Sequence, residues 1–203
     1  MPRAAVIAAL ACALGTACAG GDTEDASPPR AQAPPPAAAA HDADPQEDSG
    51  SSTSQRNDEL ERAARDVVGF LRGEVAFERL RLADTVTLYL APESGGGSAR
   101  RAREELRDLS RWRVHTGDPG ITYLFIPPER LTKLTTRVGR HLDCREYPLA
   151  SRFPALARLP HVGTMLEPHM PESCLATWNL TLVFAARPGP PTLVAAVFDQ
   201  WEW

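Results

Sequence analysis

A single α+β domain is the fold class that this 203-residue sequence predicts, and three observations lead to it. Apolar residues recur at helical spacing between positions 57 and 73. Apolar and polar residues alternate between positions 85 and 90, as in a half-buried strand. Two β-rich runs near the C-terminal end are joined by a short Pro/Gly loop, which predicts an antiparallel hairpin. We therefore expect a mixed or antiparallel sheet of about four or five strands with helices packed on one face.

The first helix is expected to start at Asn57 or Asp58, either of which can cap it, and to end at Gly73. A strand follows at Thr85–Leu90, with its valine and two leucines on the buried side. The glycine-rich stretch ESGGGS is expected to form a turn. Ser98 then serves as the cap of a second helix that continues from Arg101 to Trp112.

A turn near residue 118 leads to the apolar stretch ITYLFIPP at 121–128, which predicts a buried strand ended by two prolines. Leucines and a valine at helical spacing predict a third helix over Glu129–Leu142. Several prolines between Cys144 and Cys174 predict an irregular lobe with one short helical turn at 153–159. The runs 173–186 and 192–203 then form the hairpin, with both strands central in the sheet.

One architecture with this content is the helix and curved sheet of the nuclear-transport-factor-2/cystatin-like (NTF2/cystatin-like) shape. No motif in the sequence assigns the chain to that family, so the prediction concerns the shape alone.

The start of the chain has the pattern of an export signal. The apolar run Ala4–Leu14 is about 11 residues long, too short for a helix that crosses a bilayer core of roughly 30 Å. Small residues then lead to Cys18, and the stretch resembles a bacterial lipoprotein signal, in which such a cysteine is lipidated and becomes the first residue. Gly15 stands where the usual pattern has leucine. The resemblance implies a signal peptide over 1–18 and lipidation of Cys18.

The resulting expectation is an exported protein anchored by its lipid in the bacterial periplasm or at the cell surface. The alternative is cleavage near Ala17 or Ala19, which would release a soluble secreted protein.

Residues 19–56 predict a disordered tether. They are acidic and rich in proline, alanine and serine, and they lack the apolar residues that would offset the entropy of ordering them. Such a tether would hold the globular domain, residues 57–203, clear of a membrane. Acidic and basic residues are equally numerous in that domain, so its net charge gives no reason to expect a nucleic-acid partner.

The two remaining cysteines, Cys144 and Cys174, are expected to form a disulfide bond. Exported proteins mature in compartments where disulfides form, and Cys18 would be occupied by lipid. Closing a loop of about 30 residues would contribute roughly 3–4 kcal/mol on the chain-entropy estimate. The bond would fasten the proline-rich lobe to the first strand of the hairpin.

A catalytic role for Cys144 is the competing interpretation, with His141, His161 or His169 as its base. No glycine-rich turn presents either cysteine, which makes this role the weaker one. His161, Glu167, His169 and Cys174 are ligand types that zinc accepts, but their spacing matches no compact site. We expect no metal and no cofactor.

Aromatic side chains offer a possible binding surface. Trp178, Trp201 and Trp203, together with Tyr89, would line one face of the sheet and could hold a flat ligand or a protein partner. The alternative, which the sequence favours, is that the tryptophans cap the core under the helices.

No catalytic residue is assigned from the sequence, which lacks the motifs G-x-S-x-G and H-E-x-x-H and a phosphate-cradling glycine loop. This favours a non-enzymatic envelope lipoprotein whose domain binds an envelope protein or a small ligand, or serves as an assembly accessory. The alternative is a small exported hydrolase or transferase with its site in the lobe 144–174, using His161 or His169.

Overall fold

The structure is a computed structural model that describes residues 49–91, 95–116, 121–142, 148–170 and 176–199. Its elements, in chain order, are α1 (Ser49–Leu71), η1 (Phe77–Arg79), β1 (Leu82–Leu90), β2 (Gly97–Ala102), η3 (Arg103–Arg107), η4 (Leu109–Arg111), β3 (Arg113–His115), β4 (Thr122–Leu124), β5 (Lys133–Val138), α2 (Leu149–Arg152), η5 (Leu156–Arg158), β6 (His161–Glu167), β7 (Trp178–Phe184) and β8 (Leu193–Asp199). The η elements are short 3-10 helices. None of the helices in these ranges has both the length and the apolar content needed to cross a membrane.

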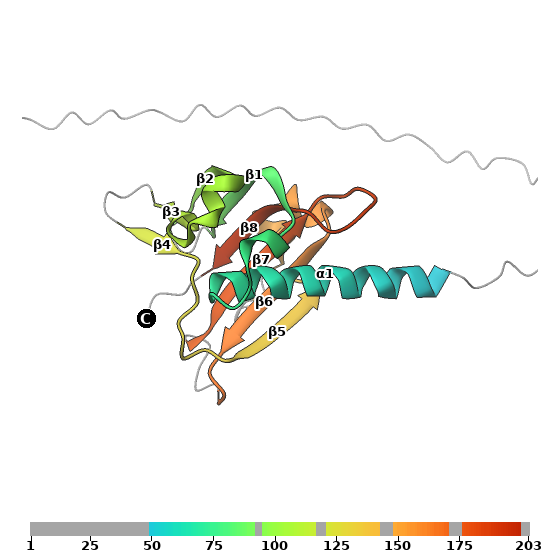
Figure 1. Ribbon diagram of the computed structural model, residues 1–203, viewed down its shortest axis with the longest axis horizontal. Coiled ribbons are helices and arrows are strands. Elements are labelled where there is room, and N and C mark those ends of the chain that lie inside the picture. The colour runs from blue at the N-terminus through green and yellow to red at the C-terminus, as the bar shows by residue number, and fades with distance from the viewer. Residues whose placement is uncertain (1–48, 92–94, 117–120, 143–147, 171–175, 200–203) are drawn as a thin grey trace, which may run out of the picture. The chain divides into compact units, whose positions relative to one another are not determined.

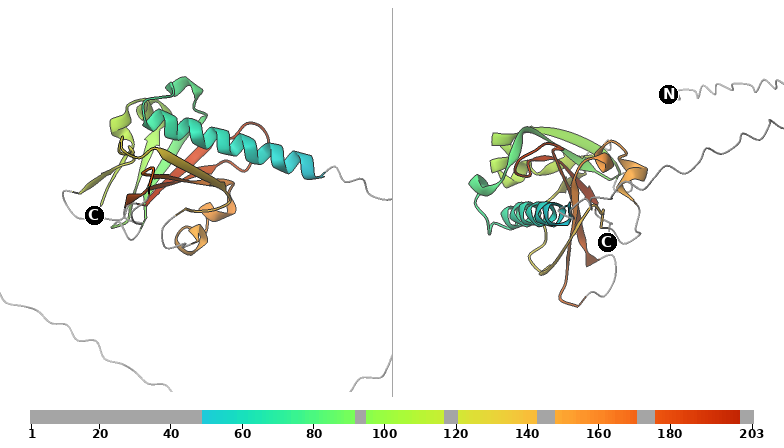
Figure 2. Two further views of the ribbon diagram at one scale, coloured as in Figure 1. Left: turned by 90° about the horizontal axis from the view of Figure 1, so that it is seen from below. Right: turned by 90° about the vertical axis from the view of Figure 1, so that its right-hand side faces the viewer.

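A six-stranded sheet in the order β2-β1-β8-β7-β6-β5 forms the centre of the fold, and β3 and β4 form a separate two-stranded sheet. Within the large sheet β1 and β8 are parallel and all other neighbours are antiparallel. The sheet wraps around the long helix α1, which lies against one face (Figures 1 and 2). The α+β class is confirmed, with more strands than the four or five expected.

Helix α1 buries the apolar stripe that the sequence predicts. Leu60, Ala64, Val67 and Leu71 are all buried in the main core, and the helix packs against β5 and β6. Its start differs from the prediction, because it begins at Ser49 and not at Asn57. The expectation of disorder is therefore wrong for residues 49–56, whereas residues 19–48 lie outside the described ranges.

A contact from a distant part of the chain helps to explain the longer helix. The Arg56 guanidinium donates hydrogen bonds to the backbone carbonyls of Arg187 (3.2 Å) and Gly189 (3.3 Å) in the loop between β7 and β8. The composition of residues 19–56, which predicts disorder, gives no sign of this contact between α1 and the β7–β8 loop.

Strand β1 has the buried and exposed sides predicted for it. The helix predicted from Arg101 to Trp112 is wrong: residues 97–102 form β2, paired antiparallel with β1, and only the 3-10 turns η3 and η4 follow. Gly95, Gly96 and Gly97 all have positive φ, a backbone conformation that glycine adopts without strain, and they close the β1–β2 hairpin.

The helix predicted over Glu129–Leu142 is also wrong, since residues 133–138 form β5. Its β-branched threonines suit a strand, and pairing with β6 overrides the helical spacing of the leucines. The lobe expected to be irregular contains β6, an interior strand between β5 and β7. This strand occupies the interval between Pro160 and Pro168, where every residue keeps its N–H group for the ladder.

Helical turns are present close to the predicted position 153–159, as α2 and η5. The strand expected from ITYLFIPP is reduced to the three residues of β4, and Ile121 and Leu124 are exposed. The C-terminal hairpin is confirmed: β7 and β8 are antiparallel, and each has a strand on both sides.

Side chains alternate between the two faces of the large sheet. Leu180 and Leu182 of β7 belong to the core cluster that includes the α1 stripe. Asn179 and Thr181, which alternate with these leucines, are also buried, on the other face. Residues 140–142 and 148–153, which we call the covering segment, lie against that second face, opposite α1 (Figure 2).

Gly163 of β6 makes the approach of this covering segment possible. A Cβ atom at this position would lie 2.4 Å from the carbonyl oxygen of Arg140 and 2.8 Å from the backbone nitrogen of Leu142. Both neighbours are backbone atoms, so any larger side chain would push the segment off the sheet.

Candidate functional site

A groove of about 1070 Å³ runs beside α1, and half of the residues that line it are charged. We call it the arginine groove. Its charged lining residues are Arg56, Glu59, Arg62, Asp66, Glu78, Arg79, Arg81, Arg103 and Arg187. Its uncharged lining residues are Ala63, Val67, Leu80, Leu82, Phe184, Gly189, Pro190, Pro191 and Thr192.

The chain before β1 forms the floor of the groove, and its alternating sequence explains which side chains face outward. In extended backbone, successive side chains point to opposite sides. Leu80 and Leu82 are buried in the core, and Arg81 between them is exposed to the groove. Arg79, at the end of η1, is exposed to the groove as well. The backbone of Arg81 is held in place, because its carbonyl accepts a 2.8 Å hydrogen bond from the N–H group of Leu193.

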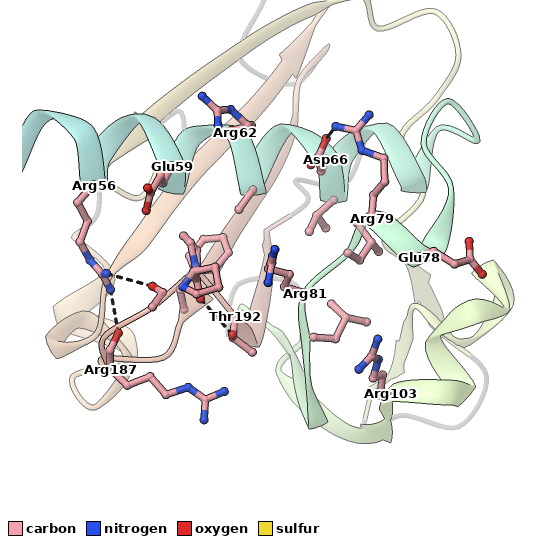
Figure 3. Close-up of a pocket in the computed structure, with 18 residues that line it drawn as sticks. Arg56, Glu59, Arg62, Asp66, Glu78, Arg79, Arg81, Arg103, Arg187 and Thr192 are labelled. Carbon is pink, nitrogen blue, oxygen red and sulfur yellow. Dashed lines mark hydrogen bonds and ion pairs between the residues drawn. The ribbon is translucent and has the colours of Figure 1, made fainter.

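The remaining arginines reach the groove from other elements. Arg56 and Arg62 come from α1, Arg187 from the β7–β8 loop and Arg103 from η3. Figure 3 shows Arg81 near the middle, with Arg187 toward one end and Arg103 toward the other. Segments far apart in the sequence thus place their guanidinium groups around one opening.

Two of the three acidic residues in the groove are already paired. Asp66 accepts a 2.8 Å hydrogen bond from Arg79. Glu78 pairs with Arg107, which lies outside the groove, and this hydrogen bond lowers the pKa of Glu78 below its usual value. Arg107 also lies over the ring of Phe77, with its guanidinium carbon 4.6 Å from the ring centroid.

Several arginines keep their charge available. Within the described residues, Arg62, Arg81 and Arg187 have no carboxylate within 4.0 Å, and Arg103 lies at that limit from Glu104. With six arginines and three acids, the groove carries an excess of positive charge although the domain as a whole is neutral. It is therefore suited to bind anions.

A second charged cluster, which we call the buried cluster, lies on the other face of the sheet. Its centre is Asp199, the last residue of β8, which is fully buried. Arg152 at the end of α2 donates a 2.8 Å hydrogen bond to Asp199 Oδ2, and His141 Nε2 lies 3.5 Å from the same oxygen. His141 Nδ1 in turn is hydrogen-bonded to the hydroxyl of Thr181.

The order hydroxyl, imidazole, carboxylate is also the order of groups in many covalent catalysts. Here the hydroxyl of Thr181 belongs to a residue with no exposed surface, so it meets no substrate in this conformation. What the cluster does is link His141 and Arg152 to strands β7 and β8 of the sheet. Removing one member of a buried ion pair is strongly destabilising.

The aromatic residues proposed as a binding face do not form one in the described part of the structure. Trp178 is 2 % exposed and packs in the core against Phe198, with ring centroids 5.9 Å apart, as in the core-capping alternative. Tyr89 is half buried and packs against Phe153 at 5.3 Å. Trp201 and Trp203 lie outside the described residues, as do Cys18, Cys144 and Cys174.

The histidines considered for metal binding or catalysis do not converge. His161 and Glu167 stand at opposite ends of β6, about 20 Å apart for six residues of strand. His161 Nδ1 is hydrogen-bonded to the carbonyl of Leu159, Glu167 pairs with Lys133 at 2.6 Å, and His169 is exposed. In the described ranges no group of three or more His, Cys, Asp or Glu side chains is arranged to hold a metal ion.

Sequence reasoning missed both charged clusters. The alternation of Arg79 and Arg81 with leucines was a local signal that the two arginines share an exposed side. Nothing in the sequence indicates that Arg187 joins them, or that Arg152 pairs with Asp199, because both relations arise from the order of strands in the sheet.

Comparisons of the chain with protein-family models, with curated proteins and with solved structures give no match.

Proposed function

We propose that this chain is a non-enzymatic binding or assembly module of the bacterial envelope, and that its ligand binds in the arginine groove. The observation that carries the proposal is that the exposed guanidinium groups of Arg62, Arg81 and Arg187 border one groove and have no carboxylate within 4.0 Å in the described residues. Arginine is enriched in protein interfaces, and pockets that hold ligands are of comparable volume, about 300–1000 Å³.

The location of the protein in the cell envelope is part of the same proposal. A lipid on Cys18 anchors the chain, the acidic residues from 19 to 48 act as a spacer, and a disulfide between Cys144 and Cys174 fastens the covering segment. Support for the anchor comes from the sequence pattern alone. The intact mass of the native protein, alkylated with and without reduction, tests both modifications together.

The likeness to the NTF2/cystatin-like shape is likewise a proposal. A long helix that lies inside a curved sheet supports it (Figure 2). The parallel pairing of β1 with β8 is the feature to compare first with the strand pairing of proteins of that shape. The alternative of a hydrolase or transferase in the lobe 144–174 gains no support from His161 and His169, because His161 begins β6 and His169 follows its other end.

Site-directed photo-crosslinking in living cells tests the binding role of the groove. A photoreactive amino acid replaces Pro190, an exposed residue that lines the groove and carries no charge. The matched control replaces Ala155, an exposed residue between α2 and η5. Irradiation is expected to give a discrete adduct from position 190 and none from position 155. Absence of an adduct at 190, or the same adducts at both positions, would overturn the proposal.

A further inference from the structure

We propose that the ligand of the arginine groove is an acidic segment of a polypeptide, bound in extended conformation along α1. This inference rests on the proposed function, since it assigns a ligand to the same groove. Two features of the groove support it, the spacing of its cations and the uncharged side chains between them, and the guanidinium groups suit such a ligand chemically.

The cations are spread along the groove. The lining residues on α1 run from Arg56 to Val67, which corresponds to about 16 Å along a helix axis. Arg81 lies near the middle of the floor, and Arg187 and Arg103 lie toward opposite ends (Figure 3). A single small anion would be met by donors that converge on one point. Spaced donors instead match a ligand with several negative groups along its length.

The cations are all arginines, as the composition dictates in a chain whose only lysine is Lys133. A guanidinium group offers planar, paired donors that match both oxygens of a carboxylate, and it is more weakly hydrated than an ammonium group. Arg62, Arg81 and Arg187 are exposed, so their donors are accessible to such a ligand. Arg56 and Arg79 have a different role, because they already bind loop carbonyls and Asp66 and so shape the walls.

Uncharged side chains lie between the arginines. Ala63 on α1 and Pro190 and Thr192 on the β7–β8 loop are at least partly exposed at the groove. A polypeptide can place apolar side chains on such surfaces while its carboxylates meet the guanidinium groups, whereas inorganic polyphosphate has no apolar groups to place there. The mixed lining thus favours a peptide.

The test is a binding titration by fluorescence anisotropy with the purified full chain. The probe is a labelled peptide of about eight residues, which spans roughly 26 Å when extended, with glutamate alternating with alanine and leucine. The control peptide has glutamine in place of every glutamate. Inorganic tripolyphosphate serves as the phosphate probe. We expect the acidic peptide to bind, the amide peptide not to bind, and affinity to fall as salt is raised.

Matched variants locate the site. Arg81→Glu combined with Arg187→Glu is expected to weaken binding of the acidic peptide at least about tenfold, because like charges then face the ligand. Arg158→Glu, an exposed arginine outside the groove, is expected to bind as the unchanged chain does. Arg81→Lys keeps the charge but loses the paired donors. Its affinity for the acidic peptide should therefore lie between that of the unchanged chain and that of the Arg81→Glu, Arg187→Glu variant. Circular dichroism verifies that every variant remains folded.

The titration is repeated with a chain in which the acidic residues between positions 22 and 48 are changed to amides, because these carboxylates would otherwise compete with the probe. Tight binding of tripolyphosphate without binding of the peptide would overturn the peptide as ligand and leave the groove as an anion site. Equal binding of the peptide by the Arg81→Glu, Arg187→Glu variant would overturn the site. If neither the acidic peptide nor tripolyphosphate bound, but crosslinking gave an adduct at Pro190, the proposal of an acidic ligand would be contradicted. The proposal that the groove binds a ligand would stand.

Discussion

The arginine groove and the buried cluster are built from the same chemical groups but differ in burial and in pairing. Asp199 and the side chain of Arg152 are almost completely buried and bonded to each other. Arg81 and Arg187 are exposed and have no carboxylate within 4.0 Å in the described residues. Charge removed from water requires a partner, whereas charge left in water does not. The first arrangement therefore serves the fold, and the second is available to a ligand.

The largest expected effect is on the buried cluster. Asp199→Ala removes the buried carboxylate that accepts a hydrogen bond from Arg152, and breaking such a buried ion pair should lower the free energy of unfolding by about 3–5 kcal/mol. Urea unfolding followed by circular dichroism measures the change. Asp84→Ala, on the exposed side of β1, is the matched control and should change stability by less than about 0.5 kcal/mol. If Asp199→Ala and Asp84→Ala were equally stable, the claim that the buried carboxylate stabilises the fold more than an exposed one would be contradicted.

The next effect concerns the segment that closes over the buried cluster. Gly163→Ala places a Cβ against the backbone of Arg140 and Leu142 and should lower the free energy of unfolding by about 1–3 kcal/mol. Hydrogen exchange should accelerate in residues 140–142 more than in α1, which lies on the other face. Unchanged exchange in 140–142 would show that the segment does not lie on the sheet as described.

A smaller effect is expected at the start of α1. Arg56→Ala removes two hydrogen bonds from an exposed side chain to the β7–β8 loop, so the loss of stability should not exceed about 1 kcal/mol. Amide exchange in residues 52–56 should nevertheless increase. Arg62→Ala, which breaks no such bond to the described residues, is the control. Equal exchange in the two variants would mean that the loop does not support this helical turn.

The smallest effect belongs to the exposed pair at the rim of the groove. Because the hydrogen bond from Arg107 lowers the pKa of Glu78 in the folded state, the pair stabilises the fold above the ordinary value of 4.5. This contribution disappears as the pH falls through the lowered pKa. The difference in melting temperature between the unchanged chain and Glu78→Gln should thus be constant near neutral pH and shrink in acid. A difference that grows in acid would contradict the assignment.

The sequence predicted best those elements whose signal is local. Alternation identified β1, and two β-rich runs around a Pro/Gly loop identified the β7–β8 hairpin. Leu131, Leu134 and Val138 have helical spacing, yet β5 forms there because β6 offers its edge for pairing. Strand β6 itself was hidden by the prolines on either side of it, which gave the whole stretch the composition of a loop.

The arginine groove could not be predicted from the sequence, for a different reason. Counting charges over the domain gave a balance of zero, which hides any separation of charge in space. The arginines of the groove come from α1, from the chain before β1, from η3 and from the β7–β8 loop. The β7–β8 loop and the chain before β1 come together because β8 pairs with β1, and that parallel pairing is a long-range relation that no local pattern reports.

The most direct test of the account measures affinity and stability on the same two variants. For Arg81→Glu we predict an affinity for the acidic peptide that is lower by about tenfold or more, with a free energy of unfolding within about 0.5 kcal/mol of the unchanged chain. For Asp199→Ala we predict the loss of several kcal/mol of stability described above. If Arg81→Glu instead bound the peptide normally, or lost as much stability as Asp199→Ala, the division between structural charge and binding charge would be contradicted.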